Sequence, residues 1–223
     1  MVMVAPMDTP IETADFLKLS QWVSPAFPVS SFAYSHGLEA EIAAGRVVCR
    51  QTAFEWITTV LTVGAGRNDA IFLCIARNAR IHIEDIIDTA RALASSQERA
   101  EETETQGRAL AEILATLGVG DGVARPYPVA LGVACRVLTT LPNHIIVAFY
   151  LQAFANMLVS ASVRFIPLTR GQGQGLLTAL HPTITESAHT IPHMTLDDIG
   201  NAAFGADMAA MEHETLGVRI FRT

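Results

Sequence analysis

Apolar residues recur every three or four positions along most of the 223-residue chain, which places them on one face of an α-helix. Strictly alternating apolar and polar runs, which mark strands, are nearly absent, and the sequence shows no internal repeat. The pattern therefore predicts an all-α fold. We expect one helical-bundle domain of about ten helices over residues 1–223, with a flexible N-terminus at about 1–12.

The periodic segments and the residues between them locate the expected helices. Helices are expected over residues 15–23, 52–63, 84–94, 96–117, 129–139, 143–165, 173–189 and 196–216. A further helix is expected from Ser30 or Ser31 to Gly45, and another starts at Asn68 or Asp69. Pro182 is a potential break in the helix that contains it.

Three of these segments carry features that bear on packing. The segment 143–165 is apolar on nearly every side, which is typical of a central, buried helix. Polar residues fill the first half of 96–117, so residues 97–106 are expected to be mostly solvated. Thr195 and Asp198 have the spacing of a capping box. Alanines at 202, 206 and 210 form a ridge of small side chains that permits close approach of a neighbouring helix.

The composition shows that the chain has fewer charged residues than most soluble domains. Hydrophobic residues make up 50% of it and charged residues 17%, whereas soluble domains usually carry about 25% charged residues. The net charge of −7 disfavours nucleic acid as a partner, and the low charge disfavours a disordered chain. Either a membrane segment or large surfaces buried against other chains would explain the apolar excess.

The sequence favours buried surfaces over a membrane segment. A spanning helix needs about 20 mostly apolar residues, and the most apolar run, residues 145–163, is interrupted by four polar residues. Residues 1–7 have no basic region of a signal peptide. The three cysteines are far apart and form no CxxC, so a reducing, cytoplasmic setting without membrane association is expected.

The sequence contains only incomplete matches to catalytic and metal-binding motifs. The glycine-rich run 171–175 lacks the Lys-Ser/Thr ending of a phosphate-binding loop and follows no strand. Glu186 and His189 have the spacing of one ligand pair of a di-iron bundle, which leaves a metal-dependent helical-bundle enzyme as an alternative, but a second pair is missing. His213 lacks the second histidine of a zinc motif and is expected to bond within the bundle or to face a partner. No catalytic residue, cofactor site or metal-ligand set is assigned.

Residues 27–39 form the most distinctive local cluster, FPVSSFAYSHGLE. Pro25, just before the cluster, and Pro28 within it predict an extended entry, after which two aromatic residues meet a histidine, a glycine and a glutamate. Phe32 and Tyr34 cannot both point inward on one narrow stripe, so one of them is expected near the surface. Such a cluster suits a partner-binding surface, and packing of the helix hairpin explains it about equally well.

The last residues are the second unusual feature. Residues 217–223, GVRIFRT, alternate apolar side chains with two arginines. Chain ends are usually polar and frayed unless they are docked. We therefore expect the C-terminal tail, residues 214–223, to dock on another surface, which can belong to a second chain.

These segments and three others resemble the urease accessory protein UreF family. The resemblance rests on SPAFPVSSFAYSHGLE (24–39), YLQAFANMLVSASVRFIPL (150–168), Gly-Gln at 173–174, DMAAMEHE (207–214) and RIFRT (219–223), in the family's order. Two places in the sequence depart from it. Ser30 stands where a glycine is usual, and Thr169-Arg170 stand where Gly-Gln is usual, so the local backbone at both places is an open question.

The resemblance implies an all-α, homodimeric and non-enzymatic scaffold. Family members bind UreD (also called UreH) and the GTPase UreG, and the complex delivers nickel to apo-urease. The resemblance places Tyr34, His36, Gly37 and Glu39 on the side of the GTPase. It places Arg219, Phe221 and Arg222 on the side of UreD. It further suggests a polar path for Ni²⁺ between chains with weak, transient ligands, for which Glu39, His36 and Asp69 are candidates.

Overall fold

The computed structural model describes residues 10–78 and 82–223, and within them it contains α-helices and short 3-10 turns but no strand. The α-helices are α1 Thr13–Trp22, α2 Leu38–Ala43, α3 Arg50–Val63, α4 Ala65–Arg77, α5 Ile83–Ala92, α6 Gln97–Thr116, α7 Tyr127–Ala134, α8 Asn143–Phe165, α9 Arg170–Thr190 and α10 Phe204–His213. The predicted all-α fold is confirmed. The expected flexible N-terminus falls mainly on residues 1–9, outside the described residues.

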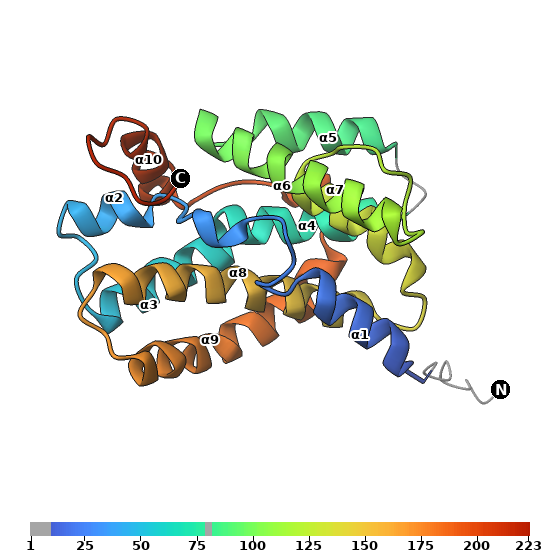
Figure 1. Ribbon diagram of the computed structural model, residues 1–223, viewed down its shortest axis with the longest axis horizontal. Helices are drawn as coiled ribbons and strands as arrows, with labels where there is room; N and C mark the ends of the chain where they lie inside the picture. The colour runs from blue at the N-terminus through green and yellow to red at the C-terminus, as the bar shows by residue number, and fades with distance from the viewer. Residues whose placement is uncertain (1–9, 79–81) are drawn as a thin grey trace.

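Helix α8 runs through the middle of the bundle, as its all-round apolar sequence predicts (Figure 1). It packs against α9 on one side and against α4, α3 and α2 on the others. Helices α4, α6 and α7 form a second packed group, with α5 lying above them in the view of Figure 1. Helix α10 and the C-terminal residues lie beside α2, at the end of the molecule away from α1.

Local signals placed several helix boundaries well. The bounds of α8 agree with the expectation, and the hydroxyl of Ser96 caps α6 by accepting the N–H of Arg99. Thr195 and Asp198 form the predicted capping box, although it opens only a short 3-10 turn. Helix α9 continues through Pro182 without a break. The glycine-rich run 171–175 is its first turn, begun by a second capping box at Thr169.

Two expected helices are wrong because non-helical backbone interrupts each of them. Between Ser30 and Gly45 the chain forms a 3-10 turn (Ser31–Ala33), an extended Tyr34 and only then α2. Ser30, His36 and Gly37 have φ of 60°, 53° and 78°, and this left-handed backbone cannot continue an α-helix. The left-handed Ser30 also explains why glycine suits that position.

The second wrong helix is 196–216. After the 3-10 turn Leu196–Asp198 the chain is irregular, and α10 begins only at Phe204. The main-chain N–H of Ala202 bonds to the carbonyl of Val63 at the end of α3 instead of continuing a helix. The alanine ridge is therefore shorter than predicted, because Ala202 lies outside α10. Helix α4 likewise begins earlier than expected, at Ala65, one residue after α3 breaks at Gly64.

The third correction concerns burial. Residues 97–106 were expected to be mostly solvated, but Arg99, Glu102, Thr103 and Gln106 are buried. Groups brought to α6 by folding satisfy three of them: Asp69 on α4 pairs with Arg99, His36 before α2 with Glu102, and the N–H of Tyr127 donates to Thr103. The fourth, Gln106, donates to Glu102 on the same helix. Sequence periodicity shows which residues share a helical face but not which polar groups face them.

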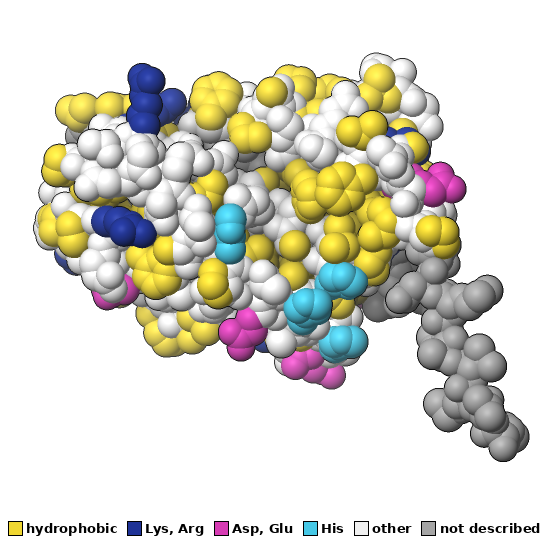
Figure 2. All heavy atoms as spheres, turned by 90° about the horizontal axis from the view of Figure 1, so that it is seen from below, with side chains coloured by type: hydrophobic (Ala, Val, Ile, Leu, Met, Phe, Trp, Pro, Cys, Tyr) yellow, Lys and Arg dark blue, Asp and Glu magenta, His cyan; other side chains and the backbone are white. Residues whose placement is uncertain are grey.

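Two runs are long and apolar enough to cross a membrane: Arg50–Arg77, which includes the break at Gly64, and α8. In the 18-residue apolar stretch of each run, 72% of the first and 56% of the second is buried inside the bundle, as expected of core helices. Figure 2 shows hydrophobic side chains spread over one face of the molecule with few acidic or basic groups between them. The apolar excess is thus shared between the core and the surface.

The fold makes a prediction at Gly37, which packs against the backbone of α10. A Cβ at Gly37 would lie 2.6 Å from the main-chain N of Ala210, and φ is +78°. Gly45 has a similar φ of +72° but open space around it. Gly37→Ala should therefore lower the free energy of unfolding by about 2 kcal/mol more than Gly45→Ala, since both carry the left-handed strain and only the first adds overlap. Urea unfolding of both variants checks this, and equal losses would contradict the close packing.

Candidate functional site

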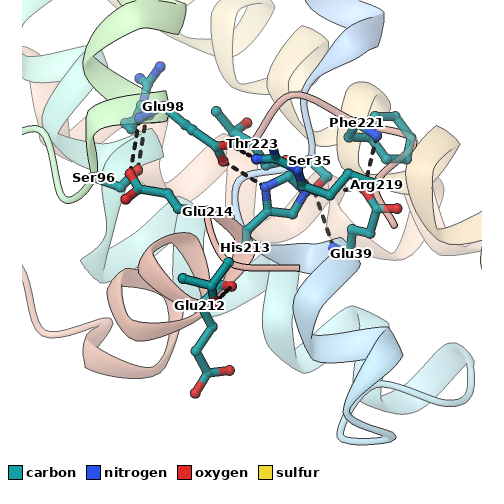
Figure 3. Close-up of polar contacts among 12 residues, drawn as sticks. Ser35, Glu39, Ser96, Glu98, Glu212, His213, Glu214, Arg219, Phe221 and Thr223 are labelled. Atoms are coloured by element: carbon teal, nitrogen blue, oxygen red, sulfur yellow. Dashed lines mark hydrogen bonds and ion pairs between the residues drawn. The ribbon is translucent and has the colours of Figure 1, made fainter. Parts of the chain in front are cut away.

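The C-terminal tail docks on its own chain, against the segment that precedes α2 (Figure 3). The main-chain oxygen of Thr223 accepts the N–H of Ser35 at 2.8 Å and also its hydroxyl. The N–H of Arg222 donates to the carbonyl of Ala33 at 2.8 Å. These contacts join two segments that are almost 190 residues apart in sequence.

Phe221 is the apolar anchor of the tail and is only 5% exposed. Its ring packs against Phe165 with centroids 5.6 Å apart, and the guanidinium of Arg164 lies 5.5 Å from its centre. The latter distance is within the range of a cation–π contact. The two neighbouring side chains, Ile220 and Arg222, face solvent. The tail thus docks on its own chain, and docking on a partner stays a prediction.

Glu39 holds the main chain of the tail. Its Oε1 accepts the N–H of Ile220 at 2.9 Å and its Oε2 the N–H of Phe221 at 2.9 Å. The Oε2 atom also lies 3.1 Å from Nε2 of His213. Glu39 is in the first turn of α2 and its side chain is 7% exposed. One buried carboxylate therefore links α2, α10 and the tail.

His213 connects this carboxylate to α6. Its Nδ1 lies 2.6 Å from Oε2 of Glu98, and its side chain is fully buried. Glu98 also pairs with Arg219 through Oε1, and its N–H donates to Glu214 at 3.2 Å. The expectation that His213 bonds within the bundle is confirmed. Figure 3 shows the ring between the two carboxylates.

A second buried network begins at His36, next to the tail. Its Nε2 lies 3.3 Å from Oε1 of Glu102, and Oε2 of Glu102 lies 3.2 Å from Arg99. Arg99 reaches Asp69 at 2.5 Å, and Asp69 accepts the hydroxyl of Tyr150 at 2.8 Å. Burial by itself would raise the pKa of Glu102, but the charges of His36 and Arg99 outweigh it and hold this pKa at about 2.

This network borders a cavity of about 90 Å³ between the residues before α2 and the middle of α8. Its walls are largely apolar and include Phe32, Met157 and Phe221. His36, Asp69, Arg99 and Glu102 supply the polar side. The volume has room for a few water molecules. Of the three candidates for a cation path, His36 and Asp69 border this cavity, whereas Glu39 is occupied by the tail.

The structure gathers the predicted site residues into one place but buries most of them. Tyr34, His36, Gly37, Glu39 and Phe221 are buried, and Arg219 and Arg222 are exposed. Of the two aromatic residues considered together, Phe32 is the exposed one at 62%, and Tyr34 is 3% exposed. The two groups assigned to separate partners by the resemblance therefore lie in contact within this chain.

Sequence reasoning missed four members of the site: Ser35, Glu98, Arg99 and Glu102. Three of them stand in the polar half of α6 that was expected to be solvated. The available signal was their spacing, because residues three and four apart on a helix share a face. A mixed-charge set with that spacing is equally typical of a solvated face.

An exposed apolar stripe lies next to the docked tail. Phe204, Met208 and Met211 repeat at helical spacing on α10 and are 71%, 61% and 52% exposed. Val218 and Ile220 of the tail are exposed by 86% and 66%. Scattered exposed apolar residues are ordinary, but a continuous row on one helix is typical of an interaction site.

The pair proposed for a metal enzyme has different surroundings. Glu186 and His189 are exposed on α9, and the ring of His189 stacks on His144 with centroids 5.2 Å apart. Among the described residues no group of three or more His, Cys, Asp or Glu side chains is placed to hold a metal ion. A shallow groove of about 230 Å³ between α8 and α9 lies close by and is lined by Phe149, His181 and Ile184.

Comparison with known proteins gives a consistent result. The model of the UreF family matches residues 47–181. A protein of Jannaschia sp. (strain CCS1) named urease accessory protein UreF is 53% identical over 95% of this chain and 96% of its own length. Proteins with the same name from Cereibacter sphaeroides (strain KD131) and Roseobacter denitrificans are 51% and 40% identical. They cover 95% and 96% of this chain, and 100% and 96% of their own lengths.

The buried network makes a prediction about acid stability. The pKa of Glu102 falls from 4.5 to about 2 on folding, so ionised Glu102 stabilises the fold above about pH 4.5, and this contribution is lost as pH falls toward 2. The stability advantage of the wild type over Glu102→Gln should therefore narrow by about 1 kcal/mol between pH 6 and pH 3.5.

Urea unfolding at several pH values measures the difference in stability between the wild type and Glu102→Gln. Glu112→Gln, an exposed position on the same helix, is the matched control and should stay within about 0.5 kcal/mol of wild type throughout. If the difference in unfolding free energy between the wild type and Glu102→Gln does not change with pH, Glu102 is not in the ionised, charge-paired state.

Proposed function

This chain belongs to the UreF family of urease accessory proteins, and on that premise we propose that it is a non-catalytic scaffold in the nickel insertion that matures apo-urease. It bridges UreD (UreH) and the GTPase UreG and modulates the GTPase. It binds no cofactor tightly and works as a cytoplasmic homodimer. The observation that carries the proposal is the exposed apolar stripe of α10 beside the docked tail.

The stripe supports the UreD side of the proposal. Phe204, Met208 and Met211 offer an apolar surface of the kind that forms the centre of a protein interface. Arg219 and Arg222 of the tail are charged, exposed groups. Phe221 is buried, so its role is to anchor the tail on which the exposed residues are presented. Large exposed apolar side chains also mean that the chain should aggregate more readily without its partner.

The UreG side is proposed for the segment Tyr34 to Glu39. His36, Gly37 and Glu39 are buried, so we infer that they act by shaping the turn that presents the exposed ring of Phe32. The scaffold can influence a GTPase only through different affinities for its nucleotide states. Such an effect needs a defined surface and no catalytic group of its own.

The polar side of the cavity supports a transient passage of Ni²⁺, with His36 and Asp69 as its proposed weak ligands. In the described arrangement the Glu102 carboxylate and one oxygen of Asp69 are already engaged by Arg99. A passing cation would meet groups that are occupied by protein partners, and this favours brief ligation over storage. No observation in the described part of the chain favours the metal-dependent enzyme over the scaffold.

The proposal predicts which residues retain UreD. Met208→Asp should weaken co-purification with UreD about tenfold or more, because it places a charge in the centre of an apolar contact. A chain cut after His213 should lose UreD altogether, since it lacks the tail. Pull-down from cells that co-express both proteins, quantified against input, measures both effects.

Leu117→Asp is the matched control, because Leu117 is 55% exposed at the far end of α6 and lies outside the stripe. It should retain UreD like the wild type. Undiminished UreD binding by both Met208→Asp and the truncated chain would overturn the assignment of this surface. A urease activation assay with the same variants then tests whether binding and maturation fail together.

A further inference from the structure

The last twenty residues, α10 and the tail (residues 204–223), are held to the bundle by little apolar packing. Within this C-terminal module the only buried hydrophobic side chains are Ala209, Ala210 and Phe221. Alanine removes little apolar surface from water, so its contribution to docking is small. A module anchored by one large side chain depends on its polar contacts to stay in place.

Those polar contacts comprise hydrogen bonds of the tail to Ala33 and Ser35 and a set of charged contacts. The module brings two cationic side chains, His213 and Arg219, to two carboxylates of the bundle, Glu39 on α2 and Glu98 on α6. The other charged groups near the His213 ring have partners of their own. Glu212 pairs with Arg46, which also holds Glu41, and Glu214 accepts the N–H of Glu98.

The hydrogen-bond geometry fixes the protonation of the ring. Both nitrogens of His213 face carboxylate oxygens, at 2.6 Å and 3.1 Å, and an ionised carboxylate can only accept. A neutral imidazole has one N–H, so one nitrogen would oppose an oxygen lone pair. Three of the four carboxylate oxygens accept other donors, and the fourth, Oε2 of Glu98, contacts only the ring. Arg219 on the same carboxylate favours its ionised form, and imidazole is a stronger base than a carboxylate. The docked arrangement is therefore satisfied by the doubly protonated ring.

We propose that His213 is a positioning residue whose protonated ring fastens the C-terminal module to Glu39 and Glu98, so that the module is released as the pH rises above neutrality. Release carries His213 and Arg219 away from the carboxylates and leaves the ring in water. There an imidazole loses its proton at about pH 6.5. Above that pH, His213 must take up a proton when the module docks. By linkage, the equilibrium constant for docking then falls by up to about tenfold per pH unit.

The inference concerns this chain alone, so it is independent of the proposed partners. Its consequence is that the apolar stripe of α10 and the tail are presented in a fixed position only while the ring is charged. His36 is the other histidine at this site, since its N–H reaches Thr223 and its ring faces Glu102. The experiment must therefore separate the two histidines.

Hydrogen–deuterium exchange of the full-length chain between pH 6 and pH 8.5, corrected for intrinsic exchange rates, tests the proposal. Peptides that cover residues 204–223 should lose protection as pH rises, whereas peptides of α8 should not. His213→Gln should lower protection of the module at pH 6 and remove its pH dependence. His181→Gln, an exposed histidine on α9, is the matched control and should behave like the wild type.

Glu98→Gln provides a test that does not weaken the ring contact. A glutamine can donate to Nδ1 of a neutral His213 while Nε2–H donates to Glu39, so the module should stay docked with less dependence on pH. Constant protection of the module in the wild type from pH 6 to pH 8.5 would overturn the proposal. The same holds if the pH dependence persists in His213→Gln and disappears in His36→Asn.

Discussion

The carboxylate of Glu39 is the contact on which the C-terminal end of this structure depends. It accepts two main-chain N–H groups of the tail and faces the ring of His213. A buried carboxylate is costly unless donors compensate it, and here the donors come from α10 and from the tail. The charge that would destabilise the interior is therefore stable only when distant parts of the chain are in place. This mutual requirement connects α2, α10 and the tail more specifically than apolar contact would.

The same logic extends inward through the N-terminal half of α6. Glu102, Arg99 and Asp69 form a continuous buried series from His36 to Tyr150, in which charged groups alternate in sign. Such a series tolerates few substitutions, because removal of one member leaves its neighbour buried without a partner. It also gives the bundle a polar cavity next to a segment that the family resemblance associates with partner binding.

The many apolar residues of the sequence lie in two parts of the structure. Some of them fill the core around α8, which packs against α1, α2, α3, α4 and α9. The rest lie on the surface, as the row on α10 and the exposed Phe32 show. A scaffold that works by holding other proteins needs surface of this kind, and membership of the UreF family gives it a biological setting. The stripe and the tail that borders it would then form one docking surface, built from residues that are 7 to 16 positions apart in the sequence.

Periodicity, caps and composition were sufficient for the all-α class, for the bounds of α8, for the start of α6 near Ser96 and for the capping box at Thr195. These properties are local, because they depend on residues within one or two turns of each other. The motif order was sufficient for the family. The interruption at His36 and Gly37 was not predictable, since it follows from close packing against α10. The burial of Glu102 and the meeting of Glu39 with His213 were decided by tertiary structure, because a charged side chain is buried only where folding brings its partner to it.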